Sequence, residues 1–450
     1  MKRAWPASGG PTASAAAAIG KVSPARAAAF EILTQVGGGN GHSDELLHSQ
    51  ITAALSPEDR NLVTALTMGV LRWQIALDAH VATLLSRPGQ RLAEPVAIAL
   101  RMGAFQLLHM DRIPAHAVLN ESVEMCRAAE QPHAAGMVNA VLRKLVAGKP
   151  TSQSREVGHP DTTAFAQRLG HPLWLVERWV KAYGRDAALA ICEYDQQEPR
   201  AGALFAPEHT DASSAAGLED AGPQMDDGSR LVAELAAAAI PNAAGRVACA
   251  WDCCAAPGGK TLVLARRLVG ADILATDVSA KRLGRTAARL KRYAYSERVR
   301  CEIADASVAT GAGAKFDLIL CDVPCSGTGT LARNPEIRHR LRAEEFARQA
   351  ARQRTILHGA LGRLAPGGQL VYSTCSLEPE ENEQVVSAVA VEVGARRVSV
   401  DPLLSKLAED GILRPEVAAT LSNTAVVDGA LRTLPGTHGC DGFFAVVLER

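Results

Sequence analysis

The sequence predicts an all-helical N-terminal domain followed by a doubly wound, Rossmann-like α/β domain. Two observations support this prediction. From residue 22 to about residue 147, apolar residues recur at spacings of three and four, which is typical of amphipathic helices. From residue 245 onward, short apolar runs alternate with segments of helical length, which indicates a βαβ series whose parallel sheet is buried on both faces.

The helical domain is expected over residues 21–147. Two of its helices begin with Ser-Pro, so Ser23 and Ser56 are the predicted N-caps, each followed by a proline at the first helical position. Three more helices are predicted from "EPVAIALRMGAFQLLHM", "PAHAVLNESVEMCRAA" and "GMVNAVLRKLVA". Residues 1–20 consist mainly of Ala, Gly, Ser and Pro, which predicts a disordered tail before this domain.

A polar segment rich in turn formers, "GKPTSQSREVGHPDTT", predicts a linker over residues 148–163. Residues 164–244 begin with an amphipathic helix, "HPLWLVERWVKAYG", and then lose clear periodicity. We expect this region to be a helical or irregular connection. The α/β domain is expected over residues 245–450.

Five strands are predicted in the α/β domain, from "RVACAWD", "ADILATD", "VRCEIAD", "FDLILCD" and "GQLVYST". The first four end in Asp252, Asp277, Asp305 and Asp322. Because open α/β sheets bind ligands at the carboxyl ends of their strands, we expect these acids to face a common crevice. One such Asp alone is more simply explained as a helix N-cap or turn residue, but four in register are not.

Charge is balanced over the chain, with 48 Lys plus Arg against 48 Asp plus Glu, which argues against a protein that coats nucleic acid with its whole surface. Basic residues nevertheless cluster in 279–300, with eight bases against one acid, and in 331–363, with eight arginines against three acids. Each run is as consistent with a solvated helix face as with a phosphate-binding face. The 4% aromatic content argues against a protein that stacks single-stranded bases.

No window holds eighteen uninterrupted apolar residues, and the first twenty residues lack the leucine-rich core of a secretory signal. We therefore expect a soluble, cytoplasmic protein with no membrane partner. The ten cysteines lack the regular spacing of a disulfide framework and are expected to be reduced thiols. Cys321 and Cys325 are too few to hold zinc, because no CxxC pair or histidine cluster accompanies them.

A loop of small residues, "CCAAPGGKT", follows the first predicted strand. It matches neither the Walker A motif, which would need glycine at position 254, nor GxGxxG, so an uncharged nucleoside is a better ligand than a phosphate. Asp277 is placed to bind ribose hydroxyls and Asp305 to contact an adenine edge, which predicts an adenosyl-type cofactor pocket. The loop candidates are Cys254, Ala255, Ala256, Pro257, Gly258, Gly259 and Lys260.

Two cysteine motifs follow the fourth and fifth predicted strands. They are "CDVPCSGTGT" and "YSTCSLEPEENE", so Cys325 and Cys375 should lie at the edge of the sheet that holds the cofactor pocket. Chemistry on one substrate is therefore favoured for both thiols. A buried, inert thiol is the favoured interpretation for the cysteines inside or beside strands, which are Cys249, Cys253, Cys301 and Cys321.

Three of these motifs resemble one enzyme family. "DCCAAPGGKT", "DVPCSGTG" and "YSTCSLEPEENE" resemble the cofactor loop and the two cysteine motifs of RNA cytosine-5 methyltransferases, which use S-adenosylmethionine. The segments "DRNLVTALTMGVLRW", "IPAHAVLNESVEM" and "GMVNAVLRKL" resemble the NusB-like RNA-binding domain that precedes the catalytic domain in the Fmu/Sun subfamily. The resemblance covers nearly the whole chain after the tail.

The resemblance implies that the thiolate of Cys375 adds to carbon 6 of cytosine, which makes carbon 5 nucleophilic, and that Cys325 assists release of the methylated product. An ordinary thiol has a pKa of about 8.5, so this attack needs a positive partner. Lys260 and the N-terminus of a helix expected near Pro379 are the candidates. The target base must leave any stack to reach the thiol.

The resemblance also gives Asp322 a contact with the cytosine edge or with the methionine end of the cofactor. Arg282 is expected to hold the intermediate, the cofactor or a phosphate. The implied substrate is 16S ribosomal RNA, at cytosine 967 for this subfamily, and we expect the protein to act as a monomer.

Two alternative functions stay open. The catalytic motifs do not name the RNA, so a transfer-RNA cytosine-5 methyltransferase is one alternative, and a non-catalytic RNA-binding or assembly factor is the other. DNA methylation is disfavoured, because its enzymes place the nucleophile in the fourth-strand motif and lack the second cysteine. The chain departs from the family in a segment between Pro199 and Asp252 that is shorter than usual and lacks a β-rich RNA-contacting pattern, and in Val323, where alanine is commoner.

Overall fold

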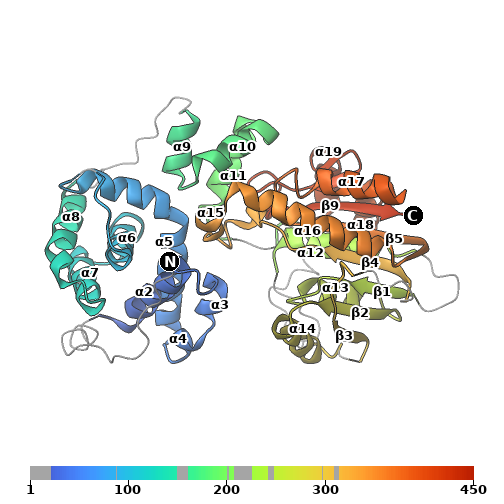
Figure 1. Ribbon diagram of the computed structural model, residues 1–450, viewed down its shortest axis with the longest axis horizontal. Coiled ribbons are helices and arrows are strands. Elements are labelled where there is room, and N and C mark those ends of the chain that lie inside the picture. The colour runs from blue at the N-terminus through green and yellow to red at the C-terminus, as the bar shows by residue number, and fades with distance from the viewer. Residues whose placement is uncertain are drawn as a thin grey trace. The chain divides into compact units, whose positions relative to one another are not determined.

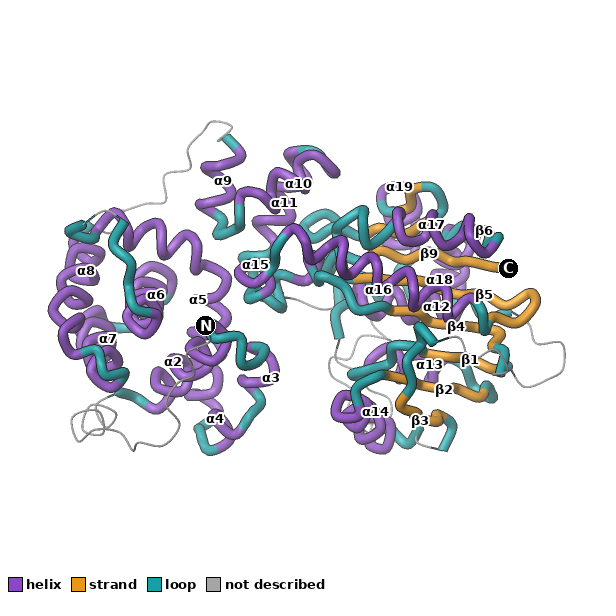
Figure 2. The backbone as a smooth tube through the Cα atoms, in the orientation of Figure 1, coloured by secondary structure: helices purple, strands orange, loops and turns teal. Residues whose placement is uncertain are grey.

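The computed structural model describes residues 22–87, 89–148, 161–199, 202–206, 225–241, 248–295, 297–308 and 314–450. The described chain divides into two compact units, drawn with element labels in Figure 1 and by secondary structure in Figure 2. The first runs to Ala182 and includes Asn334–His339; the second holds Tyr183–Arg333 and Arg340–Arg450. The predicted disordered tail and residues 149–160 of the predicted linker lie outside the described residues.

Within the described residues, every element of the first unit is a helix. The helices are α2 (Pro24–Gly37), α3 (Ser43–Leu47), α4 (Gln50–Ala53), α5 (Pro57–Leu84), α6 (Glu94–His109), α7 (Ala115–Ala128), η1 (Pro132–Ala134), α8 (Ala135–Ala147), α9 (Thr162–Arg168), α10 (Leu173–Tyr183) at the unit boundary, and the short α15 (Ile337–Arg340). All five predicted helices of the N-terminal domain are therefore present.

The two predicted serine caps behave differently. The side chain of Ser56 accepts a hydrogen bond from the Asp59 amide (3.1 Å), so it caps α5 as expected. Ser23 holds the N-cap position of α2, but its hydroxyl donates to Glu121 of α7 (2.7 Å) and caps nothing. The prediction of a side-chain cap at Ser23 was wrong, because a tertiary partner competes for the hydroxyl.

The helical unit packs around one apolar core. Its fully buried residues include Ile32 of α2, Leu66 of α5, Ile98 of α6 and Leu142 of α8. At Gly69 the helices α5 and α6 approach so closely that an added Cβ would lie 2.0 Å from the ring of Phe105. Glycine is required there by space.

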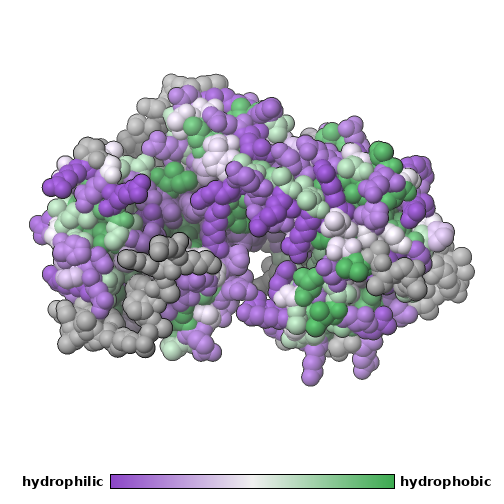
Figure 3. Space-filling model, viewed as in Figure 1, coloured by the Kyte–Doolittle hydropathy of each residue, from purple (hydrophilic) through white to green (hydrophobic). Residues whose placement is uncertain are grey.

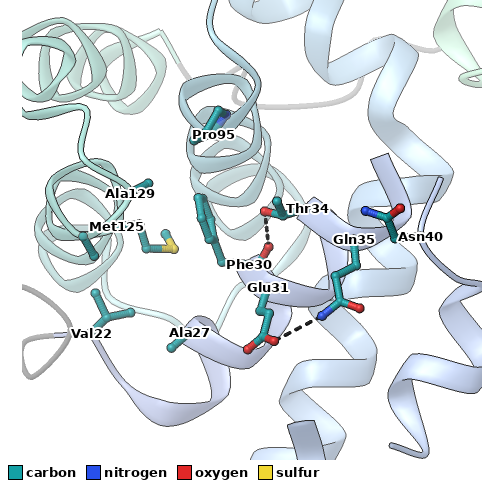
Figure 4. Close-up of a pocket in the computed structure, with 11 residues that line it drawn as sticks. Val22, Ala27, Phe30, Glu31, Thr34, Gln35, Asn40, Pro95, Met125 and Ala129 are labelled. Carbon is teal, nitrogen blue, oxygen red and sulfur yellow. Dashed lines mark hydrogen bonds between the residues drawn. The ribbon is translucent and has the colours of Figure 1, made fainter. Parts of the chain in front are cut away.

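A cavity of about 570 Å³ opens beside α2 in the same unit. Figure 4 shows apolar side chains around it from three helices, among them Phe30 of α2, Pro95 of α6 and Met125 of α7. Three polar side chains on its wall are held within α2, because Thr34 donates to the Phe30 carbonyl (2.8 Å) and Gln35 to Glu31 (3.1 Å). None of its lining residues belongs to the predicted sites.

The second unit is built on one mixed sheet with the strand order β3-β2-β1-β4-β5-β9-β8-β7, and β6 pairs with β9. The strands are β1 (Cys249–Asp252), β2 (Asp272–Asp277), β3 (Val299–Ile303), β4 (Phe316–Asp322), β5 (Leu364–Thr374), β6 (Arg396–Val398), β7 (Val426–Val427), β8 (Ala430–Arg432) and β9 (Phe444–Glu449). The five predicted strands are β1 to β5, and they are parallel as predicted.

The prediction of a wholly parallel sheet was wrong beyond β5. Strand β9 pairs with β5 in the antiparallel sense, from Gln369 opposite Glu449 to Thr374 opposite Phe444. Strands β6 and β8 are antiparallel to β9. The four additional strands were missed because three of them have only two or three residues and β9 follows a loop, where no alternation with a helix marks it.

Helices cover both faces of this sheet, as Figures 1 and 2 show. Alternate strand residues point to opposite cores: Ala250, Leu318 and Val371 pack in one cluster, and Trp251, Ile319 and Leu370 pack in the other. The first cluster is covered by α12 (Asp227–Ala238), α13 (Gly259–Arg267), α14 (Ala280–Arg292), α18 (Asp401–Glu409) and α19 (Pro415–Thr424). The second is covered by α16 (Ala343–Leu361) and α17 (Glu383–Val393).

The region expected to be a helical or irregular connection, 164–244, contains more helix than the one predicted from "HPLWLVERWVKAYG". Helix α9 begins at Thr162, inside the predicted linker, because Asp161 caps it by accepting from the Ala164 amide (2.6 Å). Helices α11 (Arg185–Tyr194) and α12 follow. The periodicity of α12 was missed because nearly all of its residues are buried, so it has no polar face. Residues 207–224 and 242–247 of the shortened segment lie outside the described residues.

Hydrophilic side chains cover most of the visible face of each unit (Figure 3). Among the helices in the described ranges, none combines the length and the apolar character that a membrane span requires. The few large apolar side chains that are exposed there are Val146, Val269, Val278, Ile303, Val308, Val391 and Val427.

Candidate active site

The carboxyl ends of β4 and β5 bring the two predicted cysteines into contact. These strands are parallel neighbours, and Asp322 at the end of β4 pairs with Ser373 of β5. A loop follows each strand at the sheet edge, and the Sγ atoms of Cys325 and Cys375 on these two loops lie 3.3 Å apart, at hydrogen-bond distance. Two thiols fifty positions apart in the chain therefore share one site.

Asp322 and Lys260 form an ion pair beside the cysteines. One oxygen of the Asp322 carboxylate accepts from Lys260 Nζ (2.8 Å) and the other from Ser373 Oγ (2.7 Å). Burial acts to lower the pKa of Lys260, but the charges of Asp322 and Cys375 and the hydrogen bond to Asp322 outweigh it, so the pKa is raised. Lys260 is therefore a cation beside Cys375.

The second predicted source of positive potential, a helix N-terminus near Pro379, lies further along the chain than expected. Helix α17 begins at Glu383 and not near Pro379. The intervening residues form a turn in which Thr374 Oγ1 donates to Asn382 Oδ1 (2.6 Å) and Asn382 Nδ2 donates to the Ser376 carbonyl (2.9 Å). These side-chain bonds compete with helical hydrogen bonds and delay the start of the helix, so Lys260 is the positive partner that the structure provides.

The two thiols differ in their surroundings. The pKa of the Cys325 thiol is raised well above its ordinary value by the hydrogen bond with Cys375, by burial, and by the charges of Cys375 and Glu381. Cys325 therefore holds its proton more tightly than an ordinary thiol does.

The predicted cofactor loop leads from β1 into α13. It is held over the sheet by the Ala255 amide, which donates to the Thr276 carbonyl of β2 (2.8 Å), and by Arg282, which donates to the Ala256 carbonyl (2.8 Å). Gly258 has φ +93°, and a Cβ there would lie 2.8 Å from the Thr286 side chain, so only glycine fits. The other loop residues are Cys254, Pro257 and Gly259.

The four strand-end acids do not all face a crevice. Asp252 is only 1% exposed and accepts from Thr261 of α13 (2.7 Å), so the expectation was wrong for this residue, whose carboxyl is used inside the fold. Asp277 is buried, accepts from the Ser279 amide (2.8 Å) and lies 3.8 Å from the Arg282 guanidinium. Asp305 is exposed, two residues beyond the end of β3.

Sequence reasoning missed an apolar surface next to these acids. Val278, Ile303 and Val308 are 51%, 65% and 59% exposed, and they lie at or just beyond the carboxyl ends of β2 and β3. Exposed apolar side chains beside a carboxylate suit an adenosine, whose base is flat and apolar on its faces and whose ribose carries hydroxyls. In the sequence, the only signal of this surface was Val278, directly after the strand-end acid Asp277.

The other cysteines near the site are packed together. The thiol of Cys253 hydrogen-bonds with those of Cys254 and Cys321, and both Cys253 and Cys321 are buried. Cys249 and Cys301 are half-buried. All ten cysteines are free, and the residues that the structure describes contain no group of three or more His, Cys, Asp or Glu side chains suited to a metal ion.

The two basic runs differ in how much charge they expose. On and after α14, six of the bases are exposed: Lys281, Arg282, Arg285, Lys291, Arg292 and Arg300. In 331–363, three arginines have structural partners instead. Arg333 is paired with Asp226 and Asp441, Arg338 is 2% exposed, and Arg363 lies over the rings of Trp251 and Phe316. The second run is therefore a weaker phosphate-binding candidate than the sequence suggested.

Comparisons with known proteins agree with this architecture. Residues 246–449 match the family model described as 16S rRNA methyltransferase RsmB/F, and residues 23–147 match the NusB family. The ribosomal RNA small subunit methyltransferase B of Vibrio cholerae serotype O1 is 31% identical, over 96% of this chain and 99% of its own length. The chain belongs to the RsmB family of ribosomal RNA methyltransferases.

Other relatives extend the comparison. The RsmB-family protein of Xanthomonas campestris pv. campestris, also named ribosomal RNA small subunit methyltransferase B, is 34% identical over 89% of this chain and 92% of its own. The crystal structure of PH0851 is similar over 95% of this chain and 99% of that chain, with a TM-score of 0.71 and 20% identity, which supports the fold alone.

As a member of the RsmB family, the chain uses S-adenosylmethionine as its cofactor. The structure fits this molecule at the edge formed by β1 and β2. Asp277 would hold the ribose, and Val278 would contact the adenine. The backbone of the glycine-containing loop from Ala255 to Gly259 would lie against the ligand. When bound, S-adenosylmethionine supplies an electrophilic methyl group.

Proposed function

We propose that this protein transfers a methyl group to carbon 5 of a cytosine in 16S ribosomal RNA, through a covalent adduct between Cys375 and carbon 6. The observation that carries the proposal is the 3.3 Å contact between the Cys325 and Cys375 sulfur atoms at the edge that holds the cofactor site. A single nucleophile would suffice for many reactions, but two adjacent thiols suit a reaction in which one attacks and the other helps the product leave.

Cys375 is the attacking thiol. Carbon 5 of cytosine is a poor nucleophile, and addition of a thiolate to carbon 6 makes an enamine-like ring that is nucleophilic at carbon 5. Lys260 lies beside Cys375 as a cation and favours the thiolate. Asp322 fixes Lys260 through the 2.8 Å ion pair and lies at the same edge, where it is placed to contact the polar edge of the ring.

Cys325 acts after the methyl group has been transferred. The adduct must lose the carbon 5 proton and expel the Cys375 sulfur. The first cause of the raised pKa of Cys325 is its hydrogen bond with Cys375, and the Cys375 charge adds to it. Once the Cys375 sulfur is bonded to carbon 6 it is neutral, so the pKa of Cys325 falls and its thiolate becomes available to accept the proton.

The choice of 16S ribosomal RNA rests on the names of the relatives and on the NusB match, and cytosine 967 is the proposed target nucleotide. The exposed bases of α14 are the proposed phosphate contacts. Cytoplasmic location and the monomeric state stay predictions.

The test is methylation of defined RNAs by the purified protein with labelled S-adenosylmethionine. Unmodified 16S RNA should yield 5-methylcytosine by nucleoside mass spectrometry, and bisulfite sequencing should place it at cytosine 967. Methylation of transfer RNA in its place would assign the chain to the alternative enzyme class. RNA binding with no methyl transfer to either RNA would indicate an assembly factor and contradict the proposal.

A further inference from the structure

Glu381 lies between the two cysteine loops, in the turn that connects β5 to α17, and its side chain is fully buried. We propose that Glu381 is a positioning residue that ties the Cys325 loop to the Cys375 loop and thereby sets the distance between the two thiols. This inference rests on the proposed two-thiol function for its importance to catalysis. The geometry that it describes can be measured without any RNA.

The Glu381 carboxylate binds the residue that follows each cysteine. Its Oε2 accepts from the Ser326 amide (2.9 Å), directly after Cys325. Its Oε1 accepts from Ser376 Oγ (2.8 Å), directly after Cys375. One side chain therefore joins the two loops at equivalent positions.

A second set of hydrogen bonds holds the same arrangement. Ser326 Oγ and Ser376 Oγ lie 3.0 Å apart, and because Ser376 donates to Glu381, the Ser326 hydroxyl is the donor between them. Gln353 Nε2 of α16 donates to Glu381 Oε2 (2.8 Å) and to the Pro324 carbonyl (2.9 Å). Tyr372 donates to the Glu381 carbonyl (2.6 Å), so the backbone of Glu381 is fixed as well.

Burying the Glu381 carboxylate destabilises the fold, so its retention needs an explanation. A buried carboxylate without a basic partner loses its hydration, and hydrogen bonds only partly recover that loss. Within the described residues, ion pairs reach other acids of this unit, among them Asp322, Asp226 and Asp441, but none involves Glu381. An apolar side chain would fill the space more cheaply, but it would not join the two loops.

The Glu381 charge also acts on the Cys325 thiol. It is among the causes that raise the pKa of Cys325, after the hydrogen bond with Cys375 and burial. The groups facing Cys325 are Cys375 and Tyr372 from β5 and its loop, and Glu381 from the same turn. A neutral residue at 381 therefore changes both the spacing of the thiols and the protonation of Cys325.

The test compares Glu381→Gln with Glu392→Gln, a control on the exposed face of α17. The first measurement is the rate at which diamide forms a disulfide between Cys325 and Cys375 in the full-length protein. The two thiols lose two protons and two electrons, and diamide takes up the protons and the electrons. We expect Glu381→Gln to slow this rate by about tenfold or more, since small displacements of reacting atoms have large kinetic effects. Glu392→Gln should match the wild type.

The second measurement separates positioning from loss of the fold. Methyl transfer by Glu381→Gln should fall in kcat by roughly 10-fold to 100-fold with KM for RNA little changed. Its alkylation profile should show Cys325 ionising at lower pH than in the wild type. Glu381→Asp, which keeps the charge, should restore the Cys325 profile more than the kcat.

Two results would overturn the inference. A folded Glu381→Gln protein with wild-type rates of diamide coupling and turnover would show that the tie is unnecessary. If Glu381→Gln does not fold, Ser376→Ala removes the hydrogen bond from Ser376 to Glu381. A wild-type rate of diamide coupling in that variant would contradict the inference. Because diamide coupling needs neither RNA nor cofactor, it can succeed even if methylation of 16S RNA fails, so the two proposals are judged separately.

Discussion

The Sγ atoms of Cys325 and Cys375 lie 3.3 Å apart, on loops that follow two adjacent parallel strands. This separation allows a hydrogen bond and is longer than the roughly 2.05 Å of a disulfide. In the proposed reaction both sulfur atoms approach one pyrimidine ring, and Lys260 contributes its charge beside Cys375. In the proposed reaction, the surroundings of each thiol separate the roles of two residues of the same type.

Replacement of Cys375 by Ala should abolish methyl transfer. Without the thiolate, carbon 5 is not activated, so turnover should fall by at least about 10³-fold while RNA binding remains. The assay is incorporation of labelled methyl groups into 16S RNA, alongside a filter-binding measurement. Cys301→Ala, at a half-buried thiol of β3, is the matched control. Substantial activity in Cys375→Ala would remove Cys375 from the role of nucleophile.

Replacement of Cys325 by Ala should leave attack intact and block release. The protein should then accumulate as a covalent complex with RNA, seen as a retarded band on a denaturing gel. The band should require S-adenosylmethionine and should be absent from the Cys325→Ala, Cys375→Ala double variant. If Cys325→Ala turned over normally with no retarded band, product release would not depend on this thiol.

Oxidation should inactivate the enzyme through the same pair of thiols. Hydrogen peroxide would oxidise the Cys375 thiol to a sulfenic acid. The Cys325 sulfur would then attack the Cys375 sulfur, and the hydroxyl group would leave as water to give a disulfide. Activity should be lost and then recovered with dithiothreitol, and peptide mass spectrometry should identify the Cys325–Cys375 link. Inactivation with no such link, or inactivation that a reductant does not reverse, would contradict this mechanism.

Replacement of Lys260 by Met should weaken attack without removing the nucleophile. The loss of the cation should reduce kcat/KM by roughly 10-fold to 100-fold near neutral pH, and activity should recover in part as the pH is raised. Lys315→Met, just before the opposite end of β4, is the control. A pH–rate profile that kept its wild-type shape in Lys260→Met would mean that Lys260 does not act on the thiol.

Asp252 should make the stability of the fold depend on pH. Burial raises its pKa from 3.8 to about 7, so the folded state holds the proton more tightly than the unfolded state. Its stabilising contribution is present in full below pH 3.8 and is lost as the pH rises to about 7, by at most about 4 kcal/mol. Urea unfolding should therefore show wild type losing stability relative to Asp252→Asn over this range.

The control for this measurement is Asp272→Asn, an exposed carboxylate at the other end of β2. It should follow the wild type across the range, because its side chain remains in water in both states. A constant difference between wild type and Asp252→Asn from pH 4 to pH 8 would show that the Asp252 carboxyl is not held protonated.

Local patterns were enough to predict much of this fold. Alternating apolar runs predicted β1 to β5, and Ser-Pro starts predicted α2 and α5. The positions of Cys325 and Cys375 after two strands predicted that both would lie at one edge of the sheet, and the structure brings their sulfur atoms into contact there. Patterns failed where burial or competition removed them. Helix α12 is buried on all sides, and β9 lies between β5 and β8 in the sheet, although no pattern nearby in the chain indicates this pairing.

The sequence by itself determined the class of protein, the order of its elements and the residue types of its site, because these follow from periodicity and from motifs a few residues long. Only the tertiary structure decided which polar groups meet. It turned Asp252 inward to Thr261, joined Lys260 to Asp322, and placed Glu381 between the residues after the two cysteines. Such contacts depend on strand order and register, which bring together positions far apart in the chain and leave no local pattern.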